Sequence, residues 1–457
     1  MTWTVFETFK RYYLYDRFTN IASEIPYLDY DLFNNQNKID FLTHKYRSVG
    51  LLNESRLKTI EHPTSSIVRE YLDTMTSQVV LQVTQNCNLR CSYCAYTDGY
   101  YNRRHQNRKM DFETAKTAVD FLLEHSKGVP QVVVGFYGGE PLLEIELIKK
   151  VISYIEETYV GKIVNYAMTT NGTLLTDDTV DYLVSKKFAL TISLDGPKEL
   201  HDKHRIFENG EGSFEVIIKN VKRMFERHPD FSRNCRTNTV LTPDKDLKCT
   251  EDFLLLSDYL KQVGTSLSFL TDTGLDDNVI YDEEVLIAQR KNELNQMLAT
   301  VGLVLLDEKS DMIGDYTKQM EKVWGVMSLG PINYEKGHPA GPCLVGSKRA
   351  FVDVDGNIYP CEKISETEEM RIGNIKKGFD IDKVRKMINI GQYTENECKE
   401  CWAFSFCTLC VASMVDSKGV SKEKRLKKCD GTKKLAKETL RNSMMLKERG
   451  FDFYRFY

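Results

Sequence analysis

Short runs of β-branched and aromatic residues alternate with segments of helical spacing through the middle of the chain. The runs span residues 79–84, 131–137, 163–168, 189–194, 236–241 and 266–270, and the helical segments between them span residues 112–125, 142–159, 177–186, 214–227 and 252–262. This alternation indicates parallel βαβ units, because a parallel return requires a crossover element. Six units are too few for a closed eight-stranded barrel. The pattern therefore predicts an α/β fold with an open, partial (β/α)6 TIM-like barrel.

Polar and glycine-rich residues follow each predicted strand. In chain order these are the first cysteines, Gly138-Gly139-Glu140-Pro141, Thr169-Thr170-Asn171-Gly172, Asp195-Gly196-Pro197, Thr242-Pro243 and Thr271-Asp272-Thr273-Gly274. Turn geometry alone also favours Gly, Pro, Asn and Asp in such loops. Barrels of this type, however, place their chemistry at the C-terminal ends of the strands. Because all six loops and three cysteines fall on that side, we expect the active site there.

The rest of the chain does not follow this alternation. Residues 11–16 and 20–25 predict a β-hairpin, and residues 30–42 predict a helix after it. We divide the chain into residues 1–78, a small α+β domain; residues 79–275, the barrel; residues 276–335, a helical bridge; and residues 336–457, a cysteine-rich domain.

Composition and charge narrow the classes of function. The chain has 457 residues, 62 Lys and Arg against 66 Asp and Glu, and 41% hydrophobic residues. This is the composition of a globular protein, and the slight negative charge gives no reason to expect nucleic acid as a partner. Its apolar runs are too short to cross a bilayer, and its first residues have no secretory signal pattern. We therefore expect a cytoplasmic protein that binds no membrane.

Twelve cysteines are present, and they are clustered. Three lie between Cys87 and Cys94 and seven between Cys343 and Cys429, whereas Cys235 and Cys249 stand apart. In a reducing cytosol, a set of this size is more typical of metal sites than of disulfides.

The first group has the spacing Cys87-x3-Cys91-x2-Cys94. Three thiolates on one short loop can ligate three irons of a 4Fe–4S cluster, and the fourth iron then stays open for a cofactor or substrate. A zinc loop is the alternative. Zinc sites, however, typically take four ligands from paired CxxC units, and His105 is the one further candidate nearby.

This spacing after the first predicted strand, together with Gly138-Gly139-Glu140-Pro141 after the second, resembles the radical S-adenosylmethionine (SAM) enzymes. The resemblance covers roughly residues 79–275. It implies that SAM binds the open iron through its amino and carboxylate groups. It also implies that an electron from the cluster cleaves SAM to a 5′-deoxyadenosyl radical, which abstracts a hydrogen from the substrate.

The same resemblance implies a set of SAM-binding residues. They are Tyr93, Gly138, Gly139, Glu140, Pro141, Thr170, Asn171, Ser193, Asp195 and Arg205. Glycines let the loop backbone come close to the methionine moiety, and Glu140 can accept a hydrogen bond from its ammonium. Tyr93 is expected near the adenine. For Asp195, a purely structural role in its loop is the alternative.

The later cysteines resemble the SPASM extension of radical SAM enzymes, which holds two auxiliary 4Fe–4S clusters. By position, one cluster would take Cys398, Cys401, Cys407 and Cys429, and the other would take Cys343, Cys361 and Cys410. The interval between Cys407 and Cys410 is one residue shorter than in the family. With the first group, the resemblance implies three clusters; a pair of zinc ribbons is the alternative for this part.

The second auxiliary cluster would have three cysteines, because residues 334–342 contain none. His338 is one candidate for a fourth ligand, and a substrate cysteine on an open iron is another. Glu362 follows Cys361 where sulfatase-maturating enzymes have aspartate, which counts against that activity. Glu362 is our candidate for a general base, and an exposed carboxylate without a role is the alternative.

Two further features suggest partners. The N-terminal hairpin and helix weakly resemble the domain with which peptide-modifying enzymes hold a leader peptide, which would add as a strand to a free edge; a simple cap on the barrel is the alternative. Residues 418–449 contain 12 Lys and Arg against 4 Asp and Glu. This excess could receive an acidic leader or a flavodoxin- or ferredoxin-like electron donor, or it could be a solvated helix face.

These observations lead to one main hypothesis. We expect a radical SAM oxidoreductase that matures a ribosomally made precursor peptide by forming Cys-derived thioether cross-links. The alternatives are an anaerobic sulfatase-maturating (formylglycine-forming) enzyme, a carbon–carbon peptide cyclase and a non-enzymatic zinc-ribbon interaction protein.

Overall fold

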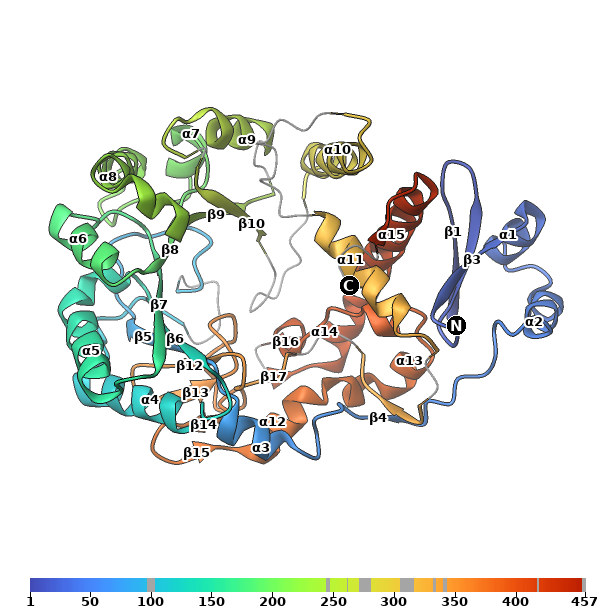
Figure 1. Cartoon of the computed structure of the whole chain (residues 1–457), viewed down its shortest axis with the longest axis horizontal. Coiled ribbons are helices and arrows are strands. Elements are labelled where there is room, and N and C mark those ends of the chain that lie inside the picture. Colours follow the sequence, from blue (N-terminus) through green and yellow to red (C-terminus); the bar gives the residue numbers. More distant parts are fainter. Residues whose placement is uncertain are drawn as a thin grey trace.

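Ten of the described strands form one sheet, which organises most of the chain (Figure 1). The computed structural model describes residues 1–457 except 97–102, 244–246, 261, 271–280, 305–315, 332–333, 340–342, 417–418 and 454–457. Residues 271–274, the predicted loop after the sixth strand, therefore lie outside the described residues.

Six consecutive parallel strands make up the larger part of this sheet. They are β5 (Gln78–Thr84), β6 (Gln131–Gly138), β7 (Ile163–Thr170), β8 (Ala189–Ser193), β9 (Cys235–Leu241) and β10 (Gly264–Phe269). Each pairs in parallel with the next in chain order, and the sheet as described stays open, with β10 at one end. The predicted α/β fold with six parallel strands is confirmed.

The crossover helices cover the outer face of these strands (Figure 1). They are α4 (Phe112–Glu124), α5 (Ile145–Thr158), α6 (Asp177–Ser185), α7 (Lys198–Asp202), α8 (Phe214–Arg227) and α9 (Leu247–Leu256). Four of them, α4, α5, α6 and α8, begin and end near the predicted residues, whereas α7 was not predicted. The helix α9 was expected over residues 252–262. It begins earlier, at Leu247, and ends where the Ser257 hydroxyl donates back to the Phe253 carbonyl.

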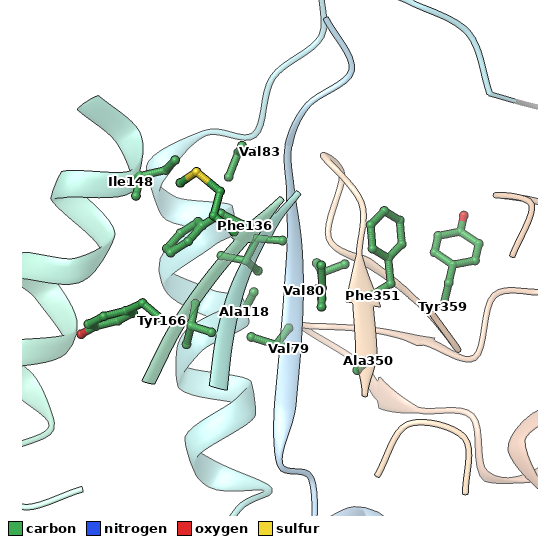
Figure 2. Close-up of a cluster of buried hydrophobic side chains, with 14 of the residues drawn as sticks. Val79, Val80, Val83, Ala118, Phe136, Ile148, Tyr166, Ala350, Phe351 and Tyr359 are labelled. Carbon is green, nitrogen blue, oxygen red and sulfur yellow. The ribbon is translucent and has the colours of Figure 1, made fainter. Parts of the chain in front are cut away.

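The other four strands of the sheet come from the cysteine-rich part of the chain. They are β12 (Ala350–Val352), β13 (Asn357–Tyr359), β14 (Gly373–Asn374) and β15 (Gly378–Phe379). β12 pairs in parallel with β5, and Figure 2 shows Ala350 and Phe351 beside Val79 and Val80. The sequence pattern did not predict this pairing. One hydrophobic cluster consequently runs from the parallel strands into the cysteine-rich part.

The N-terminal part contains a three-stranded antiparallel sheet made of β1 (Trp3–Glu7), β2 (Tyr12–Asp16) and β3 (Ile21–Ile25), followed by α1 (Tyr27–Asn34), α2 (Ile39–Arg47) and α3 (Val68–Thr74). The predicted hairpin corresponds to β2 and β3, and β1 was not predicted. The single helix expected over residues 30–42 is wrong. Gln36 and Lys38 adopt positive φ angles of 51° and 50°, which break the helix into α1 and α2.

Three helices join this N-terminal sheet in a second hydrophobic cluster. They are α10 (Glu283–Thr300), α11 (Tyr316–Ser328) and α15 (Cys429–Glu448). Tyr15, Trp324, Trp402 and Phe453 are buried in this cluster, and the Trp324 and Phe453 rings stack. In Figure 1, α15 lies between α11 and β1.

The remaining strands and α-helices are short. They are β4 (Thr59–Ile60), β11 (Lys336–Gly337), β16 (Val415–Asp416), β17 (Gly419–Val420), α12 (Ile381–Ile388), α13 (Glu395–Lys399) and α14 (Lys422–Lys427). Among the helices that the structure describes, none has both the length and the apolar character that crossing a membrane would require.

Candidate functional site

The first cysteine group lies on the loop that follows β5. Cys91 is buried, and Cys87 and Cys94 are partly so. Burial raises the pKa of the Cys87 thiol to about 12 and that of Cys91 to about 11. Without a cation at this site the thiols therefore stay protonated near neutral pH, and a metal would have to displace their protons. Within the described ranges, no three Cys, His, Asp or Glu side chains converge as they would around a single metal ion. A 4Fe–4S cluster does not require such convergence, because each of its irons takes one thiolate.

Gly138 and Gly139 let the loop after β6 pack onto this cysteine loop. A Cβ at Gly138 would lie 2.1 Å from the Thr84 carbonyl oxygen, and one at Gly139 would lie 2.1 Å from that of Asn86. At this close approach the Gly139 N–H donates to the Thr84 carbonyl at 2.9 Å. The close contact that these glycines permit is thus to the cysteine loop itself, and not only to the methionine moiety of SAM as expected.

Glu140 holds the next loop to this one. Its buried carboxylate accepts hydrogen bonds from the Thr170 hydroxyl at 2.7 Å, the Asn171 N–H at 2.7 Å and the Leu142 N–H at 3.1 Å. Despite these bonds, burial raises its pKa to about 7. Pro141, also buried, begins the short 3-10 helix that Glu140 caps. One carboxylate therefore joins the ends of β6 and β7.

Asn171 completes the contact between the loops. Its Nδ2 donates to Asn88 Oδ1 at 2.9 Å and lies 3.8 Å from the Cys87 sulfur. Ser193, the last residue of β8, is buried one strand further along the sheet. The predicted residues after β5, β6 and β7 thus form one connected surface.

Asp195 and Arg205 form a buried ion pair beside the cysteines, with 2.9 Å between Arg205 Nε and Asp195 Oδ2. The Tyr93 hydroxyl donates to the same carboxylate oxygen, and the Val240 N–H donates to the other at 2.9 Å. Arg205 also lies over the Tyr93 ring and has Nη1 3.9 Å from the Cys91 sulfur. The pair therefore places a cation next to one of the expected cluster ligands.

The later cysteines form two separate groups. Four of them line a cavity of about 190 Å³, namely Cys398, Cys401, Cys407 and Cys429. In the other group, Cys343 and Cys410 lie close enough to Cys361 for their charges to help raise its pKa, which burial raises most, to about 12. Each group is confined in space, and the donor chemistry of both suits iron–sulfur clusters.

His338, considered as a further ligand for the three-cysteine group, is used elsewhere. Its Nε2 accepts a hydrogen bond from the Gly391 N–H at 3.1 Å, and its Nδ1 lies 2.8 Å from the Pro339 carbonyl, to which it donates. Burial lowers its pKa to about 4, which matches a neutral ring. Cys235 is buried on β9, whereas Cys249 on α9 is exposed. The three-cysteine group thus has no fourth cysteine.

Glu362 is largely buried, so the alternative of an exposed carboxylate without a role is wrong. Its side chain is only 16% exposed and forms an ion pair with Arg349 at 2.5 Å. Its charge adds to the effect of burial in raising the pKa of Cys361 and of Tyr137. Glu362 therefore lies between the three-cysteine group and the end of β6.

The sequence did not predict a buried set of contacts between the two cysteine-bearing parts of the chain. The Arg103 guanidinium pairs with Glu366 at 2.9 Å and donates to the carbonyl oxygens of Glu362 and Ile364. Gln82 of β5 donates to Glu366 at 2.7 Å. No spacing signal could reveal these contacts, since the partners lie far apart in the sequence.

Comparisons with known proteins agree with this arrangement. Residues 81–256 match the radical SAM superfamily, and residues 343–403 match SPASM, an iron–sulfur cluster-binding domain. A cysteine-type anaerobic sulfatase-maturating enzyme of Clostridium novyi is 25% identical over 345 residues, which cover 72% of this chain and 86% of that protein.

One further related sequence and one solved structure cover different shares of this chain. An uncharacterized protein of Methanocaldococcus jannaschii is 34% identical over 176 residues, which are 38% of this chain and only 56% of that relative's length. The solved structure of native anSMEcpe with bound AdoMet and Cp18Cys peptide matches 82% of this chain and 99% of that one, with a TM-score of 0.61 and 19% identity. The structural likeness supports the fold.

Proposed function

We propose that this chain, which combines a radical SAM domain with a SPASM domain, is a peptide maturase that takes a hydrogen atom from a ribosomally made precursor and forms Cys-derived thioether cross-links. The observation that supports the cross-link is the group of Cys343, Cys361 and Cys410, which has no fourth cysteine. Both ring nitrogens of His338 are already engaged in hydrogen bonds. A cluster with three protein ligands leaves a position at which a substrate thiolate could bind.

The two domains indicate 4Fe–4S clusters and SAM as cofactors. We assign the SAM-binding cluster to Cys87, Cys91 and Cys94, and we propose three clusters in all. When bound, SAM and its cluster supply the 5′-deoxyadenosyl radical that accepts the hydrogen atom. Arg205 would hold positive charge beside Cys91, and Glu140 and Asn171 would hold the surrounding loops in place.

The atoms and electrons of the proposed cross-linking step balance. One hydrogen atom leaves the peptide carbon, and the cysteine thiol loses a proton while the new carbon–sulfur bond releases one electron. Glu362, beside Cys361 and paired with Arg349, is the group that we propose takes the thiol proton. The clusters that the later cysteines would hold would accept this electron, a flavodoxin- or ferredoxin-like protein would be the carrier, and the product would be lighter by two hydrogen atoms.

The precursor's leader would bind at the N-terminal sheet. β3 pairs with β2 on one side, and no described strand pairs with its other side. Such an edge can accept a peptide as an added strand through backbone hydrogen bonds. Because the proposed clusters and thiols need a reducing environment, we also propose that the protein is cytoplasmic.

Formylglycine formation on a sulfatase is the second candidate. It is favoured by the similarity to the sulfatase-maturating enzyme of Clostridium novyi, which spans 86% of that protein. Glu362 stands against it, because that family has aspartate after the corresponding cysteine.

The test uses the anaerobically purified full chain with reconstituted iron, SAM and a strong reductant. One substrate is a cysteine-containing peptide encoded beside this chain's gene, and the other is the Cp18Cys peptide. We expect deoxyadenosine together with loss of two hydrogens and of a titratable thiol from the first peptide only. Formylglycine in Cp18Cys would overturn the cross-link in favour of the second candidate. A colourless protein that carries stoichiometric zinc would show that the chain is not a radical SAM enzyme.

Variants of the two cysteine groups separate their roles. Cys91→Ala should abolish SAM cleavage, because it removes a ligand of the SAM-binding cluster. Cys429→Ala should leave part of the cleavage intact and stop product formation. Deoxyadenosine and cross-linked peptide are measured in the same reaction, and equal loss of both in the two variants would contradict separate roles.

A further inference from the structure

One hollow in the described part of the chain has no cysteine among its lining residues. It has a volume of about 410 Å³ and lies between the turn joining β1 to β2, helix α10 and helix α15. Two neighbouring hollows continue it in both directions, sharing Phe9 and Met445 on one side and Glu7 and Arg441 on the other. We call the three together the α10–α15 groove.

Exposed apolar side chains line part of this groove. Phe9, in the turn, is 84% exposed, and Leu294 and Leu303 are 43% and 57% exposed. Met297 and Met445 line the same groove. Phenylalanine and methionine on a concave surface are typical of sites that take apolar side chains from a partner.

The charges in the groove are unbalanced. Five cationic side chains line it with no ion-pair partner among the described residues, and these are Lys10, Lys434, Lys437, Arg441 and Arg449. Three carboxylates, in contrast, are engaged: Glu293 and Glu438 pair with Arg290, and Glu448 accepts two hydrogen bonds. Glu7 is the remaining carboxylate, and its charge acts on Lys437 without forming an ion pair with it. The surplus positive charge favours an acidic partner.

The groove is held in shape by its own contacts. Glu448, at the end of α15, accepts hydrogen bonds from the Thr8 and Tyr13 hydroxyls, both at 2.8 Å. These bonds fix the β1–β2 turn, and therefore Phe9, against α15. A preformed site loses little conformational entropy when a ligand binds.

We infer that the α10–α15 groove binds an acidic, amphipathic segment of the precursor peptide in helical form. Apolar side chains at i, i+3, i+4 and i+7 would enter the hollow, and acidic ones would meet the unpaired cations. The inference rests on the proposed function, and it adds a contact separate from the β3 edge. A helix suits a concave groove with an apolar floor, whereas the flat face of an electron-carrier protein would not reach that floor.

The test measures binding to the full chain by fluorescence anisotropy. The probe is a labelled synthetic amphipathic helix with Glu on its polar face and Leu on the other, and its control has Gln for every Glu. The test variant is Lys434→Glu/Lys437→Glu/Arg441→Glu. A matched control, Lys348→Glu/Lys376→Glu/Lys377→Glu, reverses three exposed charges elsewhere. Phe9→Ala is a second variant at an exposed position, where misfolding is not expected.

We expect the groove variant to lose affinity for the Glu probe by about tenfold or more, and Phe9→Ala to lose less. The charge control should bind as the unmodified chain does, and the Gln probe should bind weakly to all. Equal affinity of the groove and control variants would overturn the inference. So would displacement of the probe by an acidic flavodoxin, which would assign the groove to the electron donor.

Deoxyadenosine formation without peptide separates this inference from the proposed function. It should be the same in the groove variant as in the unmodified chain, because the groove holds no cofactor residue. If the unmodified chain forms no deoxyadenosine, the proposed function fails, whatever the probe binding shows. If it forms deoxyadenosine but the groove variant still binds the probe fully, only the groove inference fails.

Discussion

At the scale of single residues, the site depends on charges that are buried and paired. Asp195 has no exposed surface and is contacted by Arg205, Tyr93 and the Val240 N–H. Removing one partner of such a pair leaves the other charge buried without compensation, which costs more than the pair itself contributes. The network therefore fixes the position of Arg205 beside Cys91.

Asp195→Asn should lower the free energy of unfolding by about 3 kcal/mol, because the Arg205 cation stays buried without its anion. Chemical denaturation of the purified chain measures this loss. The control is Glu215→Gln, which breaks the exposed pair with Lys198 and should cost far less. Similar losses in the two variants would mean that the Asp195 pair contributes no more than a surface pair.

A second residue-scale prediction concerns pH. Burial raises the pKa of Glu251 from 4.5 to about 7, while its carboxylate accepts a hydrogen bond from Asn292. The folded chain then holds a proton that the unfolded chain has already lost. The free energy of unfolding must consequently fall as the pH rises from about 4.5 to about 7.

Glu251→Gln removes this titration. Between about pH 5 and about pH 8, the stability of the unmodified chain should fall by about 1 kcal/mol more than that of the variant, after allowance for partial solvent exposure. Denaturant melts at the two pH values give the difference. Parallel changes in both proteins would show that Glu251 titrates normally.

At the scale of elements, the site is an assembly of loops that pack on one another. The loop after β6 contacts the cysteine loop through Gly138 and Gly139, and Glu140 then holds the loop after β7. A change in one loop should therefore alter the position of Cys87 even though no cysteine is replaced.

Gly139→Ala tests this coupling, because its Cβ would overlap the Asn86 carbonyl oxygen, next to Cys87. We expect reduced iron and sulfide per chain after reconstitution, with the folded state retained. Gly264→Ala in β10 is the control, since nothing lies within 4 Å of a Cβ there. Equal iron content in the two variants would contradict the coupling.

At the scale of the whole molecule, the two matched family regions share one sheet. β12 covers the edge of β5 through parallel pairing, and buried residues of both parts form one cluster. A central strand stripped of its neighbour exposes both backbone polar groups and apolar side chains.

A chain ending at residue 335 should therefore be insoluble or aggregate, because β5 would become an uncovered edge. Soluble yield and the hydrogen-exchange protection of the β5 amides measure this. A soluble, monomeric shortened chain with protected β5 amides would show instead that the parallel sheet is stable alone.

Much of this arrangement could be predicted from local patterns. The six parallel strands follow from short β-branched runs, and the loops that carry Cys87, Glu140 and Asn171 follow from their place after those strands. The pairing of β12 with β5 and the Arg103–Glu366 contact could not be predicted. Both join distant segments, and neither leaves a periodic signal in the sequence. The break between α1 and α2 was missed because its positive φ angles fall on Gln36 and Lys38 rather than on glycine.

The burial of Trp402 directly after Cys401 has a spectroscopic consequence. Every tryptophan of the chain, namely Trp3, Trp324 and Trp402, lies outside the parallel sheet. Trp402 is the tryptophan that directly follows a cysteine. An iron–sulfur chromophore beside Cys401 would quench its ultraviolet emission, so a loss of fluorescence during reconstitution should report the filling of the four-cysteine cavity.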